Sequence, residues 1–183
     1  MKIAIIDIGS NSVRLMLWAD GKTLYKAMST TRLGEGLNFS PYLSKQACER
    51  TAQAVAEFCR LAKEEGAQEV HAFATAAVRS SKNPELFTDK VKALCGLTVD
   101  ILSGEEEAQA GLSGALGSSD GGIIDVGGAS TEVTVRKGGK IVYSHRANIG
   151  TVRILDGAGR DLKKIDEFVA EKIKVYGKAD FSN

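Results

Sequence analysis

The chain has little of what marks a nucleic-acid-binding or membrane protein. Aromatic residues make up only 6% of its 183 positions and the formal net charge is +1, so neither stacking on bases nor attraction to a polyanion is indicated. No apolar run approaches the roughly twenty residues of a membrane helix. The opening MKIAIIDIG reaches Asp7 too early for a secretory signal. We therefore expect a cytoplasmic protein with no nucleic-acid or membrane partner.

Cysteine is also scarce. The three cysteines, Cys48, Cys59 and Cys95, form neither a CxxC motif nor a Cys/His cluster, which argues against a zinc or redox site. We predict that they are small core residues of a reduced protein. The hydrophobic fraction of 43% and the charged fraction of 26% are typical of globular proteins, and the length suffices for one mid-sized domain or two small lobes.

What the sequence does contain is a succession of strand and helix patterns. Asp20-Gly21 is a strong two-residue turn signal, Ser44 and Gly66 are suited to begin and end a long helix, and Asn83-Pro84 is suited to begin another. The expected strands are 2–7, 13–19, 22–31, 69–74 and 97–102, and the expected helices are 44–65, a segment after Asn83-Pro84, and 105–117. This order predicts an α/β lobe with a mixed five-stranded sheet.

The opening pattern of three strands then starts again. IIDIGSNS at 5–12 returns as IIDVGGAS at 123–130, 118 positions later. Three further strands are expected in GGIIDVGG, STEVTVRKGG and KIVYSHRA, followed by helices near 150–156 and 161–175. We interpret this as an internal duplication, with a first lobe at 1–117 and the start of a second lobe of the same type at 118–183.

The repeated turn combines residue types that suit a phosphate group. Asp7 aligns with Asp125, Gly9 with Gly127, Ser12 with Ser130, and Arg14 with Glu132. Glycine permits positive φ and close approach of a ligand to the backbone. Turn amides and hydroxyls can point donors at an anion, and an aspartate at a strand end can hold a divalent cation. One such turn alone would more simply be a hairpin with solvent-facing polar groups, whereas the matched pair favours two facing phosphate clamps.

Six segments, taken in order, resemble a known family. They are IAIIDIGSNSVRLML, RLGEGL, FATAAVRSSKN, ILSGEEEAQAG, IIDVGGASTEV and NIGTVRILD, and they resemble the exopolyphosphatase and guanosine pentaphosphate phosphohydrolase (Ppx/GppA) family of the actin, sugar-kinase and Hsp70 (ASKHA) superfamily. The resemblance implies lobes of RNase H-like α/β fold. It also implies a Mg²⁺-assisted phosphohydrolase that removes the terminal phosphate of polyphosphate or of pppGpp, with polyphosphate or a guanosine penta- or tetraphosphate as partner.

The resemblance further implies roles for individual residues. Glu107 would be the catalytic base, although by residue type alone Glu105, Glu106 and Glu107 could be favourable charge at a helix start. Arg79 would bind phosphate through its guanidinium fork. The expected phosphate-binding residues are Gly9, Ser10, Asn11, Ser12, Gly127, Gly128 and Ser130, the expected metal ligands are Asp7, Asp125 and Glu132, and the weaker candidates are Arg14, Arg32 and Gly150.

Two features depart from the family pattern. Ala129 stands where the family has a further glycine, which would weaken the second phosphate turn if that position needs positive φ. The sequence also stops before the strands that complete the second lobe in the family, so we expect a fragment whose exposed apolar sheet favours a homodimer. Two other functions stay open, namely a non-catalytic sensor of polyphosphate or nucleotide and a kinase of the same superfamily.

Overall fold

The computed structural model describes residues 1–177, which form two compact units, the first covering Met1–Leu102 and the second beginning at Ser103. Residues 178–183 of the expected second lobe lie outside the described residues. The compact units divide at Leu102/Ser103 rather than at the expected 117/118, and helix α4 (Gly104–Leu116) packs on strands of the second sheet. Leu112 is fully buried, and a Cβ added to Gly111 would lie 3.1 Å from Cδ1 of Ile123.

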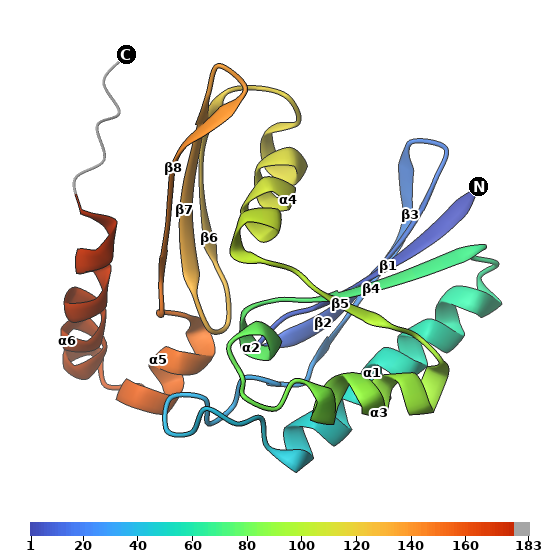
Figure 1. Cartoon of the computed structure of the whole chain (residues 1–183), viewed down its shortest axis with the longest axis horizontal. Helices are drawn as coiled ribbons and strands as arrows, with labels where there is room; N and C mark the ends of the chain where they lie inside the picture. Colours follow the sequence, from blue (N-terminus) through green and yellow to red (C-terminus); the bar gives the residue numbers. More distant parts are fainter. Residues whose placement is uncertain (178–183) are drawn as a thin grey trace. The chain divides into compact units, whose positions relative to one another are not determined.

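The first unit contains the mixed five-stranded sheet that the sequence predicts (Figure 1). Its strands are β1 (Lys2–Ile8), β2 (Ser12–Ala19), β3 (Lys22–Thr30), β4 (Glu69–Ala74) and β5 (Val99–Ile101), in the spatial order β3-β2-β1-β4-β5. The strands β1 to β3 pair antiparallel, whereas β4 pairs parallel with both β1 and β5. The mixed arrangement and the helical connections place the unit in the α/β class.

Two long helices cover one face of this sheet. Helices α1 (Lys45–Glu64) and α3 (Glu85–Cys95) pack on each other, and α1 also packs on β1 and β2. As expected, Ser44 caps α1 by accepting a hydrogen bond from the Ala47 amide at 3.1 Å. One face of α1 is buried along the helix, including Ala47, Thr51, Val55, Phe58 and Ala62. Each fully buried large apolar side chain contributes roughly 1.5–3 kcal/mol, so this stripe anchors α1.

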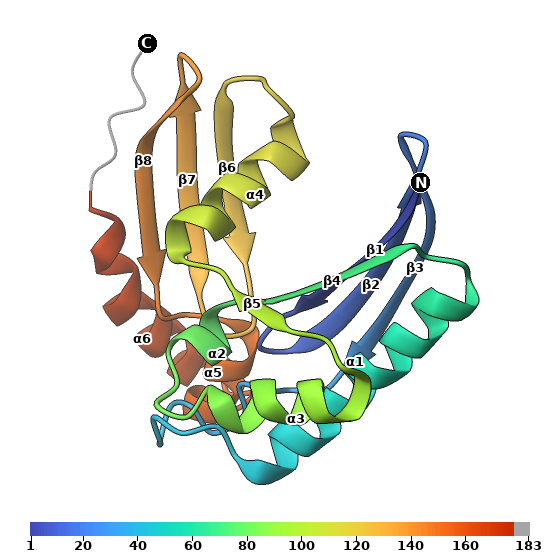
Figure 2. The ribbon, with the colours of Figure 1, turned by 45° about the vertical axis from the view of Figure 1, so that its right-hand side comes forward.

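The second unit is built on three antiparallel strands. They are β6 (Gly121–Val126), β7 (Thr131–Lys137) and β8 (Lys140–Ala147), in that spatial order (Figure 2). Helices α5 (Thr151–Ala158) and α6 (Leu162–Lys172) follow, and the 3-10 helix η1 (Ile173–Tyr176) packs on β8. Within the described part of the chain, no helix combines the length and apolar composition needed to cross a membrane.

The two meanders are the same structure at a constant offset of 118 positions. Asp20 and Gly21 form the first β2–β3 turn with φ of 52° and 77°, and the equivalent Gly138 and Gly139 have φ of 59° and 72°. The ladder is irregular after Leu17 in the first copy and after Val135, the equivalent position, in the second. Matching turns and matching irregularities confirm the internal duplication.

Candidate functional site

The two glycine turns have nearly identical geometry. The Gly9 amide donates to the Ser12 carbonyl oxygen at 3.0 Å, and the Gly127 amide donates to the Ser130 carbonyl oxygen at 2.9 Å. Neither glycine has positive φ, so that part of the sequence argument is wrong. Glycine suits the limited space, because an added Cβ would lie 3.2 Å from the Ser12 oxygen or 3.1 Å from the Ser130 oxygen, which is tighter than most Cβ contacts.

In the first unit, the RLGEGL segment packs against the turn. The Asn11 carbonyl accepts hydrogen bonds from the amides of Thr31 and Arg32 at 3.0 and 2.9 Å, and the Ser10 carbonyl accepts one from Gly34 at 2.8 Å. Arg32 has a strained backbone with φ of 50° and an exposed side chain. Its amide therefore donates a hydrogen bond to the turn, while its guanidinium group extends into solvent.

Helix α2 (Ala76–Arg79) lies beside the same turn. Gly34 is the link, since a Cβ added to it would lie 3.0 Å from Cβ of Ser10 and 3.7 Å from Cβ of Ala77. Arg79 ends this helix, is half-buried, and donates from Nη1 to the Leu102 carbonyl oxygen at 2.7 Å. The GSNS, RLGEGL and ATAAVR segments thus converge within one unit, with the guanidinium group of Arg79 held by the backbone.

Asp7 and Arg14 face each other across β1 and β2. They are register partners, and their side chains approach to 4.0 Å between Oδ2 and Nη1 while keeping 35% and 66% of their surface exposed. Such an exposed pair contributes little to stability, about 0–1 kcal/mol. The first copy therefore sets a cation opposite the aspartate, where the second copy has Glu132.

In the second unit, the turn packs on the start of α5. The Gly127 and Gly128 carbonyl oxygens accept hydrogen bonds from the amides of Thr151 and Val152 at 3.0 and 2.9 Å. A Cβ added to Gly150 would lie 2.4 Å from the carbonyl carbon and oxygen of Gly128. Gly150 is therefore required for this close approach of two backbone segments.

Ala129 fits this turn without backbone strain. Its φ is not positive, and its methyl group is buried with 3% of the residue exposed. The concern that the position needs a glycine for positive φ is thus not supported. Nε of Arg153 donates to the Ala129 carbonyl oxygen at 2.8 Å, and the Tyr176 hydroxyl donates to the Thr131 carbonyl oxygen at 2.6 Å. Sequence reasoning did not anticipate Arg153 or Tyr176.

Three charged residues form a row across the second sheet. Asp125 of β6 pairs with Glu132 of β7, which pairs with Arg146 of β8. Glu132 is only 9% exposed. Burial raises the pKa of Glu132, the charges of Glu107 and Asp125 raise it further, and Ser130 and Arg146 oppose the shift. Sequence reasoning missed Arg146, although its place opposite Glu132 follows from the hairpin register.

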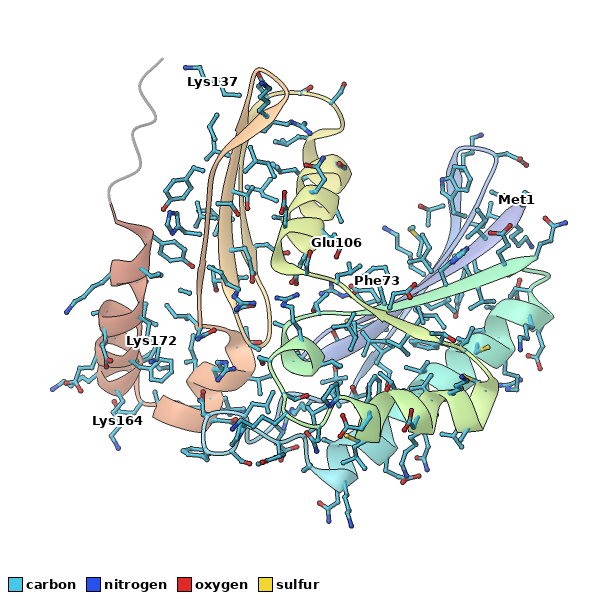
Figure 3. All side chains as sticks on the ribbon, viewed as in Figure 1. Met1, Phe73, Glu106, Lys137, Lys164 and Lys172 are labelled. Carbon is cyan, nitrogen blue, oxygen red and sulfur yellow. The ribbon has the colours of Figure 1, made fainter. Side chains whose placement is uncertain are left out.

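The start of α4 separates the roles of the three consecutive glutamates. Glu106 closes a capping box, in which Oγ of Ser103 accepts from the Glu106 amide at 3.2 Å and the Ser103 amide donates to the Glu106 carboxylate at 2.8 Å. These bonds lower the pKa of Glu106. The residue lies at the N-terminal end of α4 (Figure 3). Glu105 is exposed, whereas Glu107 is half-buried and acts electrostatically on Glu132.

The acidic side chains of the second unit are candidate ligands for a metal ion. Among residues 1–177, no group of three or more His, Cys, Asp or Glu side chains is already arranged to hold a metal ion. Oε1 of Glu132 is nevertheless buried and has no hydrogen-bond partner within that range. A desolvated carboxylate oxygen beside other acidic groups suits a divalent cation, which takes oxygen ligands and offsets their repulsion.

Several known proteins are similar to this chain in sequence. The guanosine-5'-triphosphate,3'-diphosphate pyrophosphatase of Photobacterium profundum is 33% identical over 86% of this chain, which covers 33% of that protein. The bifunctional 3-dehydroquinate synthase/phosphatase of Fusobacterium nucleatum is 31% identical over 84% of this chain and 26% of its own length. The chain thus spans about a third or less of these curated relatives.

Solved structures of related proteins are similar to this chain in fold. The Aquifex aeolicus Ppx/GppA family member is 31% identical, with a TM-score of 0.68 over 93% of this chain and 60% of that one. An exopolyphosphatase from Cytophaga hutchinsonii is 26% identical, with a TM-score of 0.76 over 85% of this chain and 53% of that one. The family model described as the Ppx/GppA phosphatase family matches residues 15–177. The chain belongs to the Ppx/GppA phosphatase family.

Proposed function

We propose that this protein hydrolyses the terminal phosphoanhydride bond of inorganic polyphosphate or of pppGpp with the help of Mg²⁺. The relatives named as an exopolyphosphatase and as a guanosine-5'-triphosphate,3'-diphosphate pyrophosphatase support both substrates. The observation that carries the proposal is the buried, partly desolvated Glu132 beside Glu107 and Asp125. Clustered acids that raise a carboxyl pKa are typical of catalytic sites.

The first unit supplies donors for phosphate oxygens. The amides and side chains of Gly9, Ser10, Asn11 and Ser12 form a turn stiffened by the bonds from the 31–34 segment. Arg79 adds a guanidinium group, whose planar fork matches a phosphate and whose charge offsets the negative charge of the transferred group. Arg14 and Arg32 have exposed side chains and would act more weakly, by attracting the polyanion.

The second unit carries its own candidate phosphate and metal ligands. Gly127, Gly128 and Ser130 form the second turn, held by α5, which Gly150 allows to approach. Glu132 and Asp125 would hold Mg²⁺, and Asp7 is the equivalent carboxylate of the first unit. The ion, when bound, neutralises charge on the phosphate oxygens.

Glu107 is the proposed base. It removes a proton from a water molecule as the water oxygen bonds to the terminal phosphorus and the bridging P–O bond breaks. The shortened phosphate chain leaves with the electron pair of that bond. Glu107 suits this role because it is the half-buried member of the three glutamates, whereas Glu106 is engaged in the helix cap.

Phosphate release from each substrate, measured with and without Mg²⁺, tests the proposal. We expect release from at least one of the two substrates, and its loss on chelation of Mg²⁺ or in Glu132→Gln. Binding of polyphosphate or pppGpp, measured by calorimetry in parallel, distinguishes the alternative. Tight binding with no release from either substrate would show a sensor and overturn the proposed hydrolysis.

A further inference from the structure

The carbonyl oxygens of the second glycine turn are held by hydrogen bonds, most of them from the start of α5. Three consecutive carbonyl oxygens bond to the first three residues of that helix. The pairs are Gly127 with the Thr151 amide at 3.0 Å, Gly128 with the Val152 amide at 2.9 Å, and Ala129 with Nε of Arg153 at 2.8 Å. Helix α5 therefore fixes the direction of three successive peptide groups.

The amides of these peptide groups point away from α5. In a planar trans peptide the carbonyl and the N–H of the next residue point in opposite directions, which applies here to the amides of Gly128, Ala129 and Ser130. None of the three donates to a backbone acceptor within residues 1–177, although Ala129 and Ser130 are only 3% and 4% exposed. Buried amides normally have a partner, and successive turn amides bind anions. The turn is therefore arranged to receive phosphate oxygens.

The first unit holds the equivalent peptide group with different donors. Asn11 stands at the position of Ala129, and its carbonyl oxygen accepts hydrogen bonds from the amides of Thr31 and Arg32 at 3.0 and 2.9 Å. Arg32 has φ of 50°, a conformation that is unfavourable for a residue other than glycine, and it makes this bond nevertheless. The same carbonyl is thus fixed by two backbone amides in one unit and by a guanidinium group in the other. What the two units share is the direction of this peptide group.

Arg153 contacts the turn through its side chain, whereas the other α5 donors are backbone amides. The side chain is half-buried. Burial and the charge of Arg146 lower the pKa of Arg153, and the charge of Asp156 raises it. A buried cation needs hydrogen-bond partners to offset its lost hydration, and the Ala129 carbonyl oxygen is one of them. Of the bonds from α5 to the turn carbonyls, substitution of Arg153 would remove only this one.

We propose that Arg153 is a positioning residue of the second phosphate turn, which holds the Ala129 carbonyl and thereby directs the Ser130 amide at a phosphate oxygen. This inference rests on the proposed role of that turn in phosphate binding. Arg153 does not itself contact the phosphate. Its contribution is an amide that is already oriented, so no reorganisation is needed when the anion binds.

Binding of methylenediphosphonate with Mg²⁺ tests the inference, because this phosphate analogue has no P–O–P bond to hydrolyse. Calorimetry measures its affinity, and NMR follows single amides. We expect Arg153→Met to weaken binding about tenfold or more, the usual effect of losing a hydrogen bond to a charged group. The binding-induced shift of the Ser130 amide should be lost. That of the Gly128 amide should remain, because the Gly127 carbonyl still bonds to α5.

Arg160→Met is the matched control, since it removes the same charge from an exposed residue just after α5. It should bind the probe as wild type does and show both amide shifts. Arg153→Gln, which also lacks the guanidinium group, takes the place of Arg153→Met if circular dichroism shows that the latter does not fold.

The possible outcomes separate this inference from the proposed hydrolysis. Wild-type affinity and an unchanged Ser130 shift in a folded Arg153 variant would overturn the positioning role alone. Equal loss of the Gly128 and Ser130 shifts would also contradict it, because Arg153 would then not act on one peptide group. Phosphate release by wild type with no probe-induced shift of these amides would refute the inference and leave hydrolysis standing. Absence of both binding and release would refute the two together.

Discussion

At the scale of single residues, Gly150 occupies a position that no other residue can take without rearrangement. We expect Gly150→Ala to lower the free energy of unfolding by about 2 kcal/mol or more, because overpacking against fixed backbone costs roughly 1–3 kcal/mol and the added carbon would lie 2.4 Å from Gly128. Urea denaturation followed by circular dichroism measures the change.

Gly114→Ala is the control for this prediction. Gly114 lies within α4, and nothing would lie within 4 Å of an added Cβ. Alanine in a helix interior is favoured over glycine by roughly 0.5–1 kcal/mol, so this variant should be slightly more stable. Equal effects of the two substitutions would refute the packing argument for Gly150.

Glu132 should make stability depend on pH. Its pKa in the folded chain is raised above the usual 4.5, so the folded state keeps a proton that the unfolded chain has lost. Stability from this group is therefore fully present below pH 4.5 and declines as the pH rises through the folded pKa. We expect the unfolding free energy of wild type, measured relative to that of Glu132→Gln, to fall as the pH rises from 4.5 through the pKa of Glu132 in the folded chain.

Mg²⁺ should reduce the loss of unfolding free energy that wild type shows at higher pH, because a bound cation stabilises the ionised carboxylate. It should leave the unfolding free energy of Glu132→Gln unchanged. Denaturation of both proteins at several pH values, with Mg²⁺ or with a chelator, provides the comparison. A difference between the two proteins that does not vary with pH would show that Glu132 is not held in a desolvated site.

Residue types of the candidate site could be predicted, but their contacts could not. Asp125, Glu132 and Glu107 stand out as acids near a glycine turn, and Arg146 could have been found from the hairpin register. Arg153 and Tyr176 hold the turn through its carbonyl oxygens. Those bonds depend on how α5 and η1 fold back, and no local pattern in the sequence encodes this.

At the scale of elements, α4 depends on its cap. We expect Ser103→Ala to lower the unfolding free energy by about 0.5–2 kcal/mol, the usual cost of losing a serine N-cap, because the substitution removes the Oγ that accepts a hydrogen bond from the Glu106 amide. Ser113→Ala, an exposed site on the same helix, should change it far less. Similar losses in the two variants would contradict the role of the cap.

The strands were predictable because each is bounded by turn chemistry, such as Asp20-Gly21 and Gly138-Gly139 with their positive φ. The unit to which α4 belongs was not predictable in the same way. Its apolar face, with Ala108 and Leu112 buried, shows that it packs on something. Only the tertiary fit of Gly111 to Ile123 identifies the second sheet as that partner.

At the scale of the whole molecule, one meander is used twice with different chemistry. The position that faces the strand-end aspartate is Arg14 in the first unit and Glu132 in the second. We infer that the first copy is specialised for binding phosphate, while the acidic second copy is specialised for metal and base. The same scaffold thus carries opposite charge at equivalent positions.

We propose that Glu107 activates the attacking water, and the rate of phosphate release by Glu107→Gln tests this role most directly. We expect a loss of about 10²–10⁴-fold, the usual contribution of a general base, while calorimetry shows substrate affinity close to wild type. Glu105→Gln, two residues away and exposed, should keep its rate. Release by Glu107→Gln at the wild-type rate would contradict the account.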